Sequence, residues 1–256
     1  MIRFASLGSG SDGNALLVEA GATRVLADCG FNLNDTLTRL ARLGVAPESI
    51  AAILITHEHD DHVGGAARLS RKFGIPVWLT YGTCQAAAKV LGNLETVKIF
   101  DCHARFAIGD IEIEPYTVPH DAREPSQFVF SDGSARVGLL TDAGSLTAHM
   151  HEVLNGLDAL ILECNHDSTM LWDGVYPQRL KERIAGKFGH LDNSTAAELL
   201  AHIDCSRLKH LIAAHLSKQN NTPELARAAL AGALNCELEW VHVATQHDGF
   251  SWREVS

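Results

Sequence analysis

Apolar runs and amphipathic segments alternate along the first third of the chain, a pattern typical of strands that alternate with helices. The segment 34–43 predicts a helix with Asn34 as its N-cap and Gly44 as its stop signal. Strands are expected at 2–7, 14–19, 23–28, 51–55 and 77–79, and further helices near 63–73 and 83–91. The loop 8–13, rich in glycine and serine, separates the first two strands.

The middle of the chain is richer in strand patterns. Ile111-Glu112-Ile113-Glu114 alternates apolar and polar residues, and the runs 127–131 and 135–141 flank Asp132-Gly133, a strong hairpin signal. Beyond them the pattern predicts helices near 146–154, 177–185, 195–203 and 223–234, and strands at 158–163, 209–214, 239–243 and 249–252.

Two of these helix starts carry capping signals. Thr195 with Glu198 fits a capping box, and Thr222 before Pro223 fits an N-cap with proline at the first helical position. No repeat or long linker interrupts the order of elements. Residues 1–256 are therefore expected to form one α/β domain with layered sheets and outer helices.

Composition narrows the class of protein. The chain is 46% hydrophobic, enough for a full core, yet no apolar stretch reaches the roughly 18 residues of a membrane span. The first residues are broken too soon by glycine to be a secretory signal. The six cysteines lie far apart without a Cys-x-x-Cys pair, which disfavours a thiolate zinc site and fits reduced thiols. We therefore expect a cytoplasmic protein with no membrane partner.

The net charge of −10 weakens the case for a protein that binds nucleic acid through a broadly basic surface. Two bound divalent ions would add +4 at one point, so the charge does not exclude a nucleic-acid substrate. The chain also holds 14 histidines, which directs attention to histidine as ligand or catalyst.

Three imidazoles and a carboxylate follow the apolar run 51–55 in the pattern His-x-His-x-Asp-His. These residues are His57, His59, Asp61 and His62. Imidazole and carboxylate are ligands for zinc and similar divalent metals. His57 and His59 can point the same way from extended chain, whereas Asp61 and His62 lie past a turn. The surplus over one tetrahedral site predicts two ions that share an activated water.

Additional ligands are expected where other apolar strands end in a polar residue. His120 follows the run 113–119, Asp142 follows 137–141, and His215 follows 211–214. Any one of these residues alone would be an ordinary polar group at a strand end. Together with the histidine cluster they complete a set of seven candidate metal ligands.

This set resembles the pattern of the metallo-β-lactamase fold superfamily, element by element and over nearly the whole chain. The resemblance implies a four-layer αββα sandwich and assigns Asp28 a structural role in ordering the ligands by hydrogen bonding. It also implies a division in which His57, His59 and His120 hold one ion, Asp61, His62 and His215 hold the other, and Asp142 bridges.

Local motifs resemble the YycJ/WalJ group, exonuclease-type members of this superfamily related to ribonuclease Z and the PhnP phosphodiesterases. The motifs are 4–14, Glu163-Cys164-Asn165-His166-Asp167, Gly189-His190-Leu191-Asp192-Asn193 and 214–217. The resemblance implies that His190 donates a proton or contacts phosphate. Asp192 stands where the YycJ group usually has serine.

Basic residues precede His190 and are candidates for contact with the phosphate backbone. Arg179, Arg183 and Lys187 are the substrate-binding candidates, together with His166; a solvated helix face is the plainer interpretation of the same charges. The glycine and serine loop 8–13 offers backbone N–H groups to phosphate, although turn formation explains it equally well.

The resulting hypothesis is a dinuclear metal-dependent phosphodiesterase, favoured as a DNA exonuclease. A metal-bridging hydroxide attacks phosphorus, Asp61 orients it, and His190 protonates the leaving oxygen. Zinc or manganese is expected, with iron as an alternative. The rival hypotheses are a hydrolase of a thioester, a lactam or a small nucleotide phosphodiester, and a non-catalytic metal-binding module. The sequence leaves oligomeric state, exonuclease polarity and the choice between DNA and RNA open.

Overall fold

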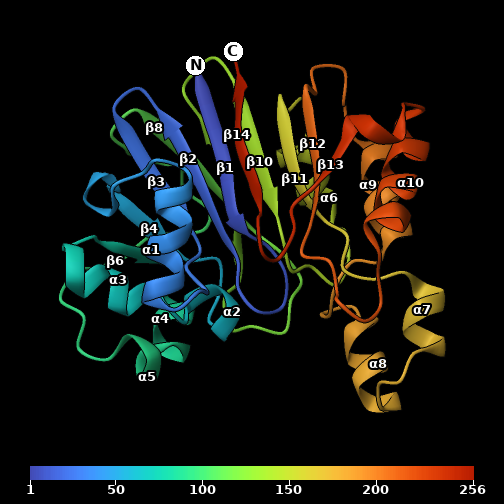
Figure 1. Ribbon diagram of the computed structural model, residues 1–256, viewed down its shortest axis with the longest axis horizontal. Helices are drawn as coiled ribbons and strands as arrows, with labels where there is room; N and C mark the ends of the chain where they lie inside the picture. Colours follow the sequence, from blue (N-terminus) through green and yellow to red (C-terminus); the bar gives the residue numbers. More distant parts are fainter.

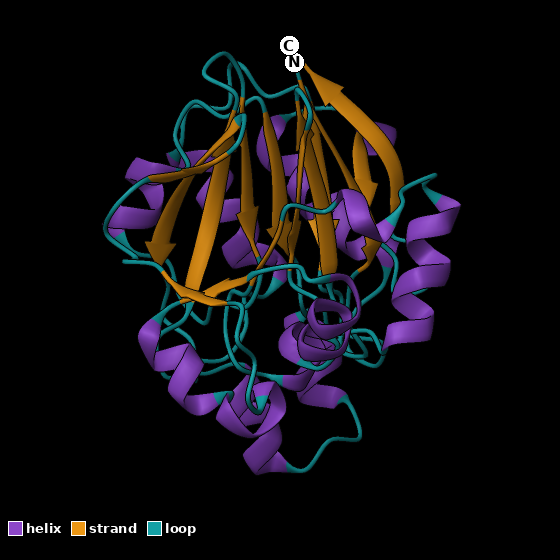
Figure 2. Ribbon diagram, turned by 90° about the vertical axis from the view of Figure 1, so that its left-hand side faces the viewer, coloured by secondary structure: helices purple, strands orange, loops and turns teal.

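Two seven-stranded sheets pack face to face, and helices cover both outer faces (Figures 1 and 2). This computed structural model describes residues 1–256. The first sheet has the order β14-β1-β2-β3-β4-β5-β6, and the second has the order β13-β12-β11-β10-β9-β8-β7. The fold is the predicted αββα sandwich.

The first sheet and its helices come mainly from the first 100 residues. Its strands are β1 (Ile2–Gly8), β2 (Ala15–Ala20), β3 (Thr23–Ala27), β4 (Ala52–Leu54), β5 (Val77–Leu79), β6 (Val97–Ile99) and β14 (Phe250–Val255). Its helices are α1 (Leu33–Arg42), α2 (Asp60–Val63), α3 (Ala66–Phe73), α4 (Tyr81–Ala86) and α5 (Ala88–Leu91), with a 3-10 turn at Pro47–Ser49.

The second sheet holds most of the remaining chain. Its strands are β7 (Phe106–Ile108), β8 (Ile111–Thr117), β9 (Ser126–Ser131), β10 (Arg136–Leu140), β11 (Ala159–Glu163), β12 (His210–Ala214) and β13 (Val241–Val243). The helices are α6 (Ala148–Val153), α7 (Ser168–Asp173), α8 (Gln178–Ile184), α9 (Asn193–His202) and α10 (Pro223–Leu234), with a 3-10 turn at Leu238–Trp240.

Three apolar clusters correspond to the three interfaces between the four layers. Phe4, Ile113 and Phe128 belong to the cluster between the sheets. A second cluster lies between the second sheet and its helices, and a third between the first sheet and its helices. Because strands β3–β6 and β10–β13 run parallel within their sheets, the carboxyl ends of several strands meet at one edge. This edge lies opposite the two chain termini (Figure 1).

Several predicted boundaries are wrong for local reasons. The helix expected at 63–73 is divided into α2 and α3, and the strand expected at 239–243 begins with a 3-10 turn. The N-cap of α1 is Asn32, not Asn34, and the N-cap of α9 is Asp192, not Thr195. Asp192 accepts hydrogen bonds from the backbone N–H groups of Ser194 and Thr195. The Thr222 cap and the hairpin around Asp132-Gly133 are confirmed.

No helix is long and apolar enough to cross a bilayer. All six cysteines are unpaired.

Gly30 permits the close approach of the first sheet to the helix that carries two candidate ligands. A Cβ atom at this position would lie 1.8 Å from the carbonyl oxygen of Asp61. We expect Gly30→Ala to destabilise the fold by about 1–3 kcal/mol through overpacking. Since a domain of this size loses roughly 2–4 °C per kcal/mol, the melting temperature should fall by roughly 2–12 °C.

Gly232→Ala is the matched control for this substitution. Gly232 is exposed on α10 and a Cβ atom there would meet nothing within 4 Å. The control should stabilise the protein by about 0.5–1 kcal/mol, because alanine is the better helix former. Thermal unfolding followed by circular dichroism measures both variants. Equal melting temperatures for the two variants would contradict the steric argument.

Candidate metal centre

The candidate ligands lie where strands of both sheets end. His57 and His59 follow β4, and Asp61 and His62 belong to the short helix α2. His120 lies beyond the end of β8, Asp142 beyond β10, and His215 directly after β12. Residues from four separate segments of the chain therefore meet at one edge of the sandwich.

Two of these ligands, and Asp28 behind them, have an unusual backbone conformation. Asp28, Asp142 and His215 have positive φ values of 62°, 37° and 54°. Residues other than glycine rarely adopt this region, and such strain is found where the surrounding structure holds a functional side chain in place. The only other such residue is Asn235, which ends α10.

The first donor group consists of His57, His59 and His120. Nε2 of His57 lies 3.0 Å from Nδ1 of His59, and Nε2 of His120 lies 3.3 Å from the same atom. Donor atoms of all three residues lie within 4.8 Å of one another. This spacing allows three imidazole nitrogens to surround one ion.

The second donor group consists of Asp61, His62 and His215, whose donor atoms also lie within 4.8 Å of one another. Oδ2 of Asp61 lies 3.4 Å from Nε2 of His62 and 3.3 Å from Nε2 of His215. Asp142 forms a further donor set with His57 of the first group and His62 of the second. It therefore lies between the two groups. The donor atoms of the seven candidate ligands thus lie in overlapping sets, and Asp142 forms one more set with Glu163, His190 and His215.

The donor chemistry fits a metal ion. Nδ1 of His62 contacts Oδ2 of Asp28 at 2.7 Å, so that His62 presents Nε2 as an unprotonated acceptor when the imidazole is neutral. This Nε2 lies 2.9 Å from Oδ2 of Asp142, a buried oxygen that has no hydrogen-bond partner. Two acceptors that face each other at this distance need a proton or a metal cation between or beside them.

The pKa values of the cluster reflect the same demand for positive charge. Burial opposes a charged imidazole at His215, yet Asp142, Asp61 and Glu163 outweigh it and raise its pKa to about 9. Likewise the surrounding carboxylates raise the pKa of His62 well above its ordinary value despite burial. Burial lowers the pKa of His57 and His120, which keeps these imidazoles neutral and available as ligands.

His190 is held beside this cluster by a buried glutamate. Glu163 is fully buried, and its Oε1 lies 2.7 Å from Nδ1 of His190. Its Oε2 accepts hydrogen bonds from the backbone N–H groups of Ala143 and Leu191. Burial alone would lower the pKa of His190, but Glu163 and Asp142 raise it to about 10. Because Nδ1 is engaged, Nε2 is the ring nitrogen free to act on a substrate.

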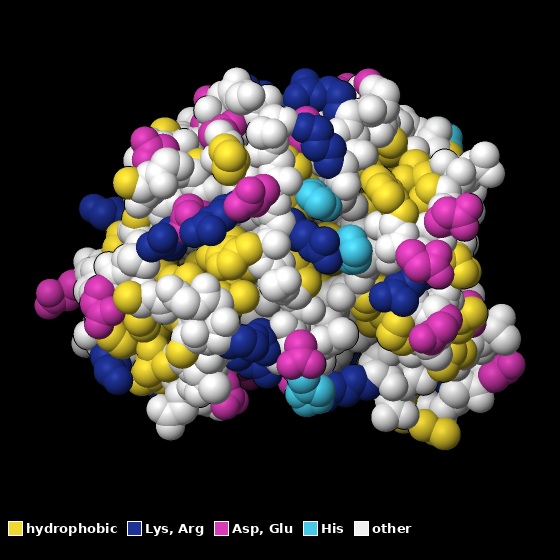
Figure 3. All heavy atoms as spheres, turned by 45° about the horizontal axis from the view of Figure 1, so that its top comes forward, with side chains coloured by type: hydrophobic (Ala, Val, Ile, Leu, Met, Phe, Trp, Pro, Cys, Tyr) yellow, Lys and Arg dark blue, Asp and Glu magenta, His cyan; other side chains and the backbone are white.

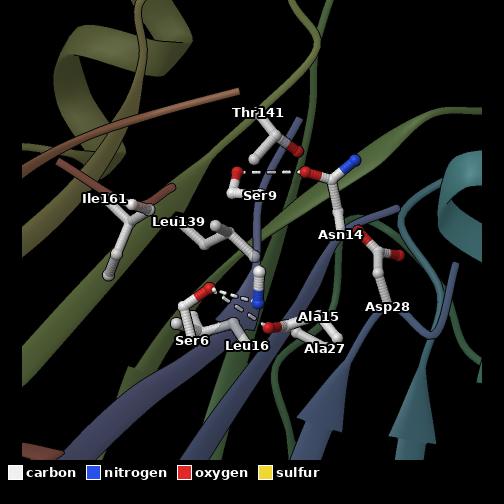
Figure 4. Close-up of a pocket in the computed structure, with 12 residues that line it drawn as sticks. Ser6, Ser9, Asn14, Ala15, Leu16, Ala27, Asp28, Leu139, Thr141 and Ile161 are labelled. Carbon is white, nitrogen blue, oxygen red and sulfur yellow. Dashed lines mark hydrogen bonds between the residues drawn. The ribbon is translucent and has the colours of Figure 1, made fainter. Parts of the chain in front are cut away.

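Residues of the loop between β1 and β2 contact all three members of the second donor group. Asn14 donates to Oδ2 of Asp61 at 3.3 Å and lies 3.2 Å from Nε2 of His62. Ser9 donates to Oδ1 of Asn14 and accepts a hydrogen bond from the backbone N–H of His215. Figure 4 shows Ser9, Asn14 and Asp28 around a small cavity of about 20 Å³ between the sheets, the size of one water molecule.

An open cavity of about 370 Å³ lies over the cluster. His59, Asp61, Asp142, His190 and His215 line it, together with polar side chains of neighbouring loops. The rest of its wall comes from the segment around α7 and α8 and includes Tyr176, Arg183 and Ile184. The candidate ligands are therefore accessible to a substrate of the size of a nucleotide.

The four expected substrate contacts have different positions. Arg183 lines the cavity, and Nε of its guanidinium lies 2.6 Å from Oδ2 of Asp121. Arg179 lines an adjoining hollow that shares Arg183 with the cavity. Lys187 is exposed outside the cavity lining, and His166 is 2% exposed and does not line it either. The backbone of His166 instead pairs with that of Asp192, so we do not retain His166 as a substrate contact.

Sequence reasoning missed Glu163, Asn14 and Ser9 as parts of the site. Glu163 ends the apolar run 158–163, the same signal that selected Asp142. The roles of Asn14 and Ser9 carry no comparable signal, because serine and asparagine are ordinary turn residues.

A two-sheet sandwich with histidine and aspartate donor groups at its strand ends defines a metallo-hydrolase of the metallo-β-lactamase fold. The family model described as "Beta-lactamase superfamily domain" matches residues 23–215, and the chain belongs to this family.

Similar proteins include an exodeoxyribonuclease and a diphosphatase. Exodeoxyribonuclease YycJ of Bacillus anthracis is 37% identical over 237 residues, which cover 91% of this chain and 89% of YycJ. The fold is similar to that of YhfI from Bacillus subtilis, with a TM-score of 0.76, 19% identity and coverage of 99% of both chains. A diphosphatase from the PhnP family gives a TM-score of 0.71 and 19% identity, with coverage of 100% of this chain and 98% of the diphosphatase.

The expected family resemblance and fold are therefore confirmed, as is the assignment to metal-dependent hydrolases.

Proposed function

We propose that this protein is a DNA exonuclease that holds two divalent ions, zinc or manganese, and hydrolyses phosphodiester bonds at a strand end. The observation that carries the proposal is the pair of donor groups that share Asp142 on the floor of an open cavity, beside His190. The name of the similar exodeoxyribonuclease YycJ supports DNA as the substrate.

In this proposal His57, His59 and His120 hold one ion, Asp61, His62 and His215 hold the other, and Asp142 is shared. Divalent ions bound there would supply Lewis acidity and a nucleophile at neutral pH. The protein's own contribution is to fix the donors. Asp28 orients His62, and Asn14 orients Asp61. Asp61 also faces the cavity and is placed to orient the attacking group.

His190 is assigned as the general acid. Glu163 stabilises the charged imidazolium through the contact at Nδ1, so Nε2 carries a proton toward the cavity. Transfer of this proton to the leaving oxygen of the cleaved phosphodiester avoids the formation of an alkoxide. Solvent returns a proton to His190, whose side chain is 22% exposed.

We assign the cavity wall formed by the α7 and α8 segment to contact with the substrate strand. Arg183 and Arg179 lie one helical turn apart on α8, and both line hollows at the mouth of the site. Guanidinium groups suit phosphate oxygens, and the ring of Tyr176 in the cavity wall offers a face for a base. Lys187 is close in sequence and adds positive charge.

Digestion of end-labelled nucleic acid tests the proposal. The metal-stripped protein is reconstituted with zinc, manganese or iron and given duplex DNA, single-stranded DNA, RNA and closed circular DNA. We expect stepwise shortening of linear DNA and no cleavage of circular DNA. A thioester and a lactam at equal enzyme concentration serve as comparison substrates. Faster turnover of either of them, or equal cleavage of circular DNA, would overturn the assignment.

The proposal includes a cytoplasmic location. Its support is the set of six unpaired cysteines, which fits a reducing compartment. Fractionation of cells that express the protein would test this part separately from the activity.

A further inference from the structure

The carboxylate of Asp121 joins the first donor group to the wall of the catalytic cavity. Its Oδ2 lies 2.6 Å from Nε of Arg183, which lines that cavity. Its Oδ1 lies 3.5 Å from Nε2 of His120 and 3.8 Å from Nε2 of His59. One carboxylate group therefore separates the guanidinium of Arg183 from two imidazoles that are assigned to the first ion.

Main-chain hydrogen bonds hold Asp121 and Arg183 in this relation. The N–H of Asp121 donates to the carbonyl oxygen of Phe188 at 2.9 Å. The chain after α8 folds back on that helix, because the N–H of His190 donates to the carbonyl oxygen of Ile184 at 2.9 Å. The segment that carries Asp121 is therefore bonded to the chain that follows Arg183 as well as to the Arg183 side chain.

The ion pair leaves the outer end of the guanidinium free. Asp121 contacts Nε, and the two terminal nitrogens of Arg183 donate no hydrogen bond to the protein. Arg183 is the one residue that lines both the catalytic cavity and the adjoining hollow of about 490 Å³ at α8. Terminal guanidinium nitrogens bind phosphate oxygens in pairs. Two free donors of this kind therefore lie at the border between the cavity and the hollow.

Arg179 lies one helical turn earlier on α8 and lacks such a partner. It lines the hollow, is exposed, and forms no ion pair or hydrogen bond through its side chain. A free arginine side chain loses its rotamer freedom when it binds a phosphate, whereas Asp121 already restrains Arg183. Of the two arginines, Arg183 is the one that is held ready for a ligand.

Stability of the fold does not account for this ion pair. The side chains of Arg183 and Asp121 are 61% and 30% exposed. Ion pairs with this exposure contribute little to the free energy of folding, because water screens them and two long side chains lose freedom. The effect of Asp121 is therefore expected in the placement of the guanidinium.

The charge of the whole molecule makes the position of single arginines important. The chain holds 31 acidic and 21 basic residues, and acidic side chains lie among basic ones on the face shown in Figure 3. A nucleic-acid strand therefore depends on cations placed beside the cavity rather than on a broad basic surface. Helix α8, which carries Arg183, lies at the edge opposite the chain termini, where the donor groups also lie (Figure 1).

We propose that Asp121 is a positioning residue that holds Arg183 for the phosphate next to the one that is cleaved. This inference rests on the proposed nuclease function and adds to it a subsite for a second phosphate. The cleaved phosphate must lie over the donor groups, and Arg183 lies one carboxylate further out, where the cavity meets the hollow. Because the second phosphate does not react, its contact with Arg183 lowers KM and changes kcat little.

Dinucleotides with one or two phosphates test this subsite. Thymidine dinucleotide, which has one phosphate, and the same dinucleotide with a second phosphate at its 5′ or its 3′ end are added as competitors while the metal-loaded protein cleaves end-labelled DNA. We expect the inhibition constant to be about 10–100-fold lower for one of the two-phosphate forms, the range for a hydrogen bond to a charged group. The preferred form reports which way the strand runs past α8.

Three variants show whether Asp121 acts through Arg183. Asp121→Asn keeps the shape of the side chain and should lower the preference for the second phosphate about 3–10-fold, because Arg183 must then be immobilised on binding. Arg183→Gln should remove most of the preference. In the double variant, Asp121→Asn should add less than about twofold to the effect of Arg183→Gln, since the two residues act as one unit. With DNA as substrate, Asp121→Asn should raise KM more than it lowers kcat.

Glu114→Gln is the matched control. Glu114 pairs with Arg105 at 2.7 Å, its side chain is 21% exposed, and neither residue lines the catalytic cavity. This control should keep the preference of the wild type for the second phosphate. Metal content should be the same in the wild type, in the control and in Asp121→Asn, because Asp121 belongs to no donor set.

An unchanged preference in Asp121→Asn would overturn the inference. Tighter binding of the two-phosphate form by this variant would do so too, since the carboxylate would then act only as a competing negative charge. Independent effects in the double variant, or loss of metal from Asp121→Asn, would assign Asp121 a different role. If the wild type cleaves DNA without any preference, the subsite fails and the nuclease stands. If the wild type cleaves no DNA, the proposed function fails together with the inference.

Discussion

Substitution of His190 by alanine should lower kcat for DNA cleavage by about 10²–10⁴-fold, the usual contribution of a general acid. The reason is that Glu163 holds Nδ1 of His190 at 2.7 Å and helps to raise the pKa of this imidazole to about 10, whereas His215 is assigned to metal binding. Metal content should stay at the wild-type level, because His190 is assigned to proton transfer. Steady-state kinetics with metal analysis on the same preparation measures both quantities.

The leaving group provides the decisive control for this role. A p-nitrophenyl phosphodiester has a leaving group that needs no protonation, so the loss of kcat on this substrate should be much smaller than the loss on DNA. Glu163→Gln should show the same pattern with a smaller effect, because it weakens the imidazolium without removing it. An equal loss on both substrates, or loss of metal from the His190 variant, would show that His190 is a ligand instead.

Substitution of Asp142 by alanine should abolish binding of both ions and lower turnover below detection. Asp142 is 2% exposed and forms a donor set with His57 of one donor group and His62 of the other. Without it, the two groups lose their common anionic donor and the compensation for two cations. Metal analysis after reconstitution should find both ions reduced, whereas loss of a single ion would contradict the shared position.

Asp142→Ala and the wild type should also differ in how their melting temperatures respond to metal chelation. A ligand present at 100 times its Kd stabilises the folded state by about 2.7 kcal/mol, which corresponds to roughly 5–10 °C in a chain of this size. Chelation of metal should lower the melting temperature of the wild type by this amount and leave that of Asp142→Ala unchanged. His103→Ala, at an exposed histidine outside the cluster, should respond to chelation as the wild type does.

The candidate ligands could be selected from the sequence because their signals are local. His57, His59, Asp61 and His62 follow a buried strand within six residues, and the remaining ligands each end an apolar run. The strand periodicity placed most elements of both sheets correctly. The four-layer arrangement came from the family resemblance, which the structure confirms.

The elements that were missed are short or weakly patterned. Strands β6 and β7 have three residues each and are largely exposed or half-buried, so they lack the apolar alternation of a core strand. Helix α7 has six residues and ends at Gly174. The break between α2 and α3 falls at Gly64 and Gly65, and a Cβ at Gly65 would lie 1.9 Å from the carbonyl oxygen of Phe31, a contact that no local pattern reveals.

The parts of the site that escaped prediction depend on contacts between distant segments. Ser9 meets His215 across 206 residues, and Asn14 meets Asp61 across 47. Residue type and spacing along the chain identify ligands that follow strands, but they carry little information on which side chains a fold brings together from opposite sheets.

The most direct test of the central claim is to titrate the metal-stripped protein with zinc or manganese and to follow the release of nucleotides from end-labelled DNA. Two donor groups that share Asp142 predict activity that rises to a plateau at two ions per chain. Full activity at one ion per chain, or activity independent of added metal, would contradict the dinuclear account.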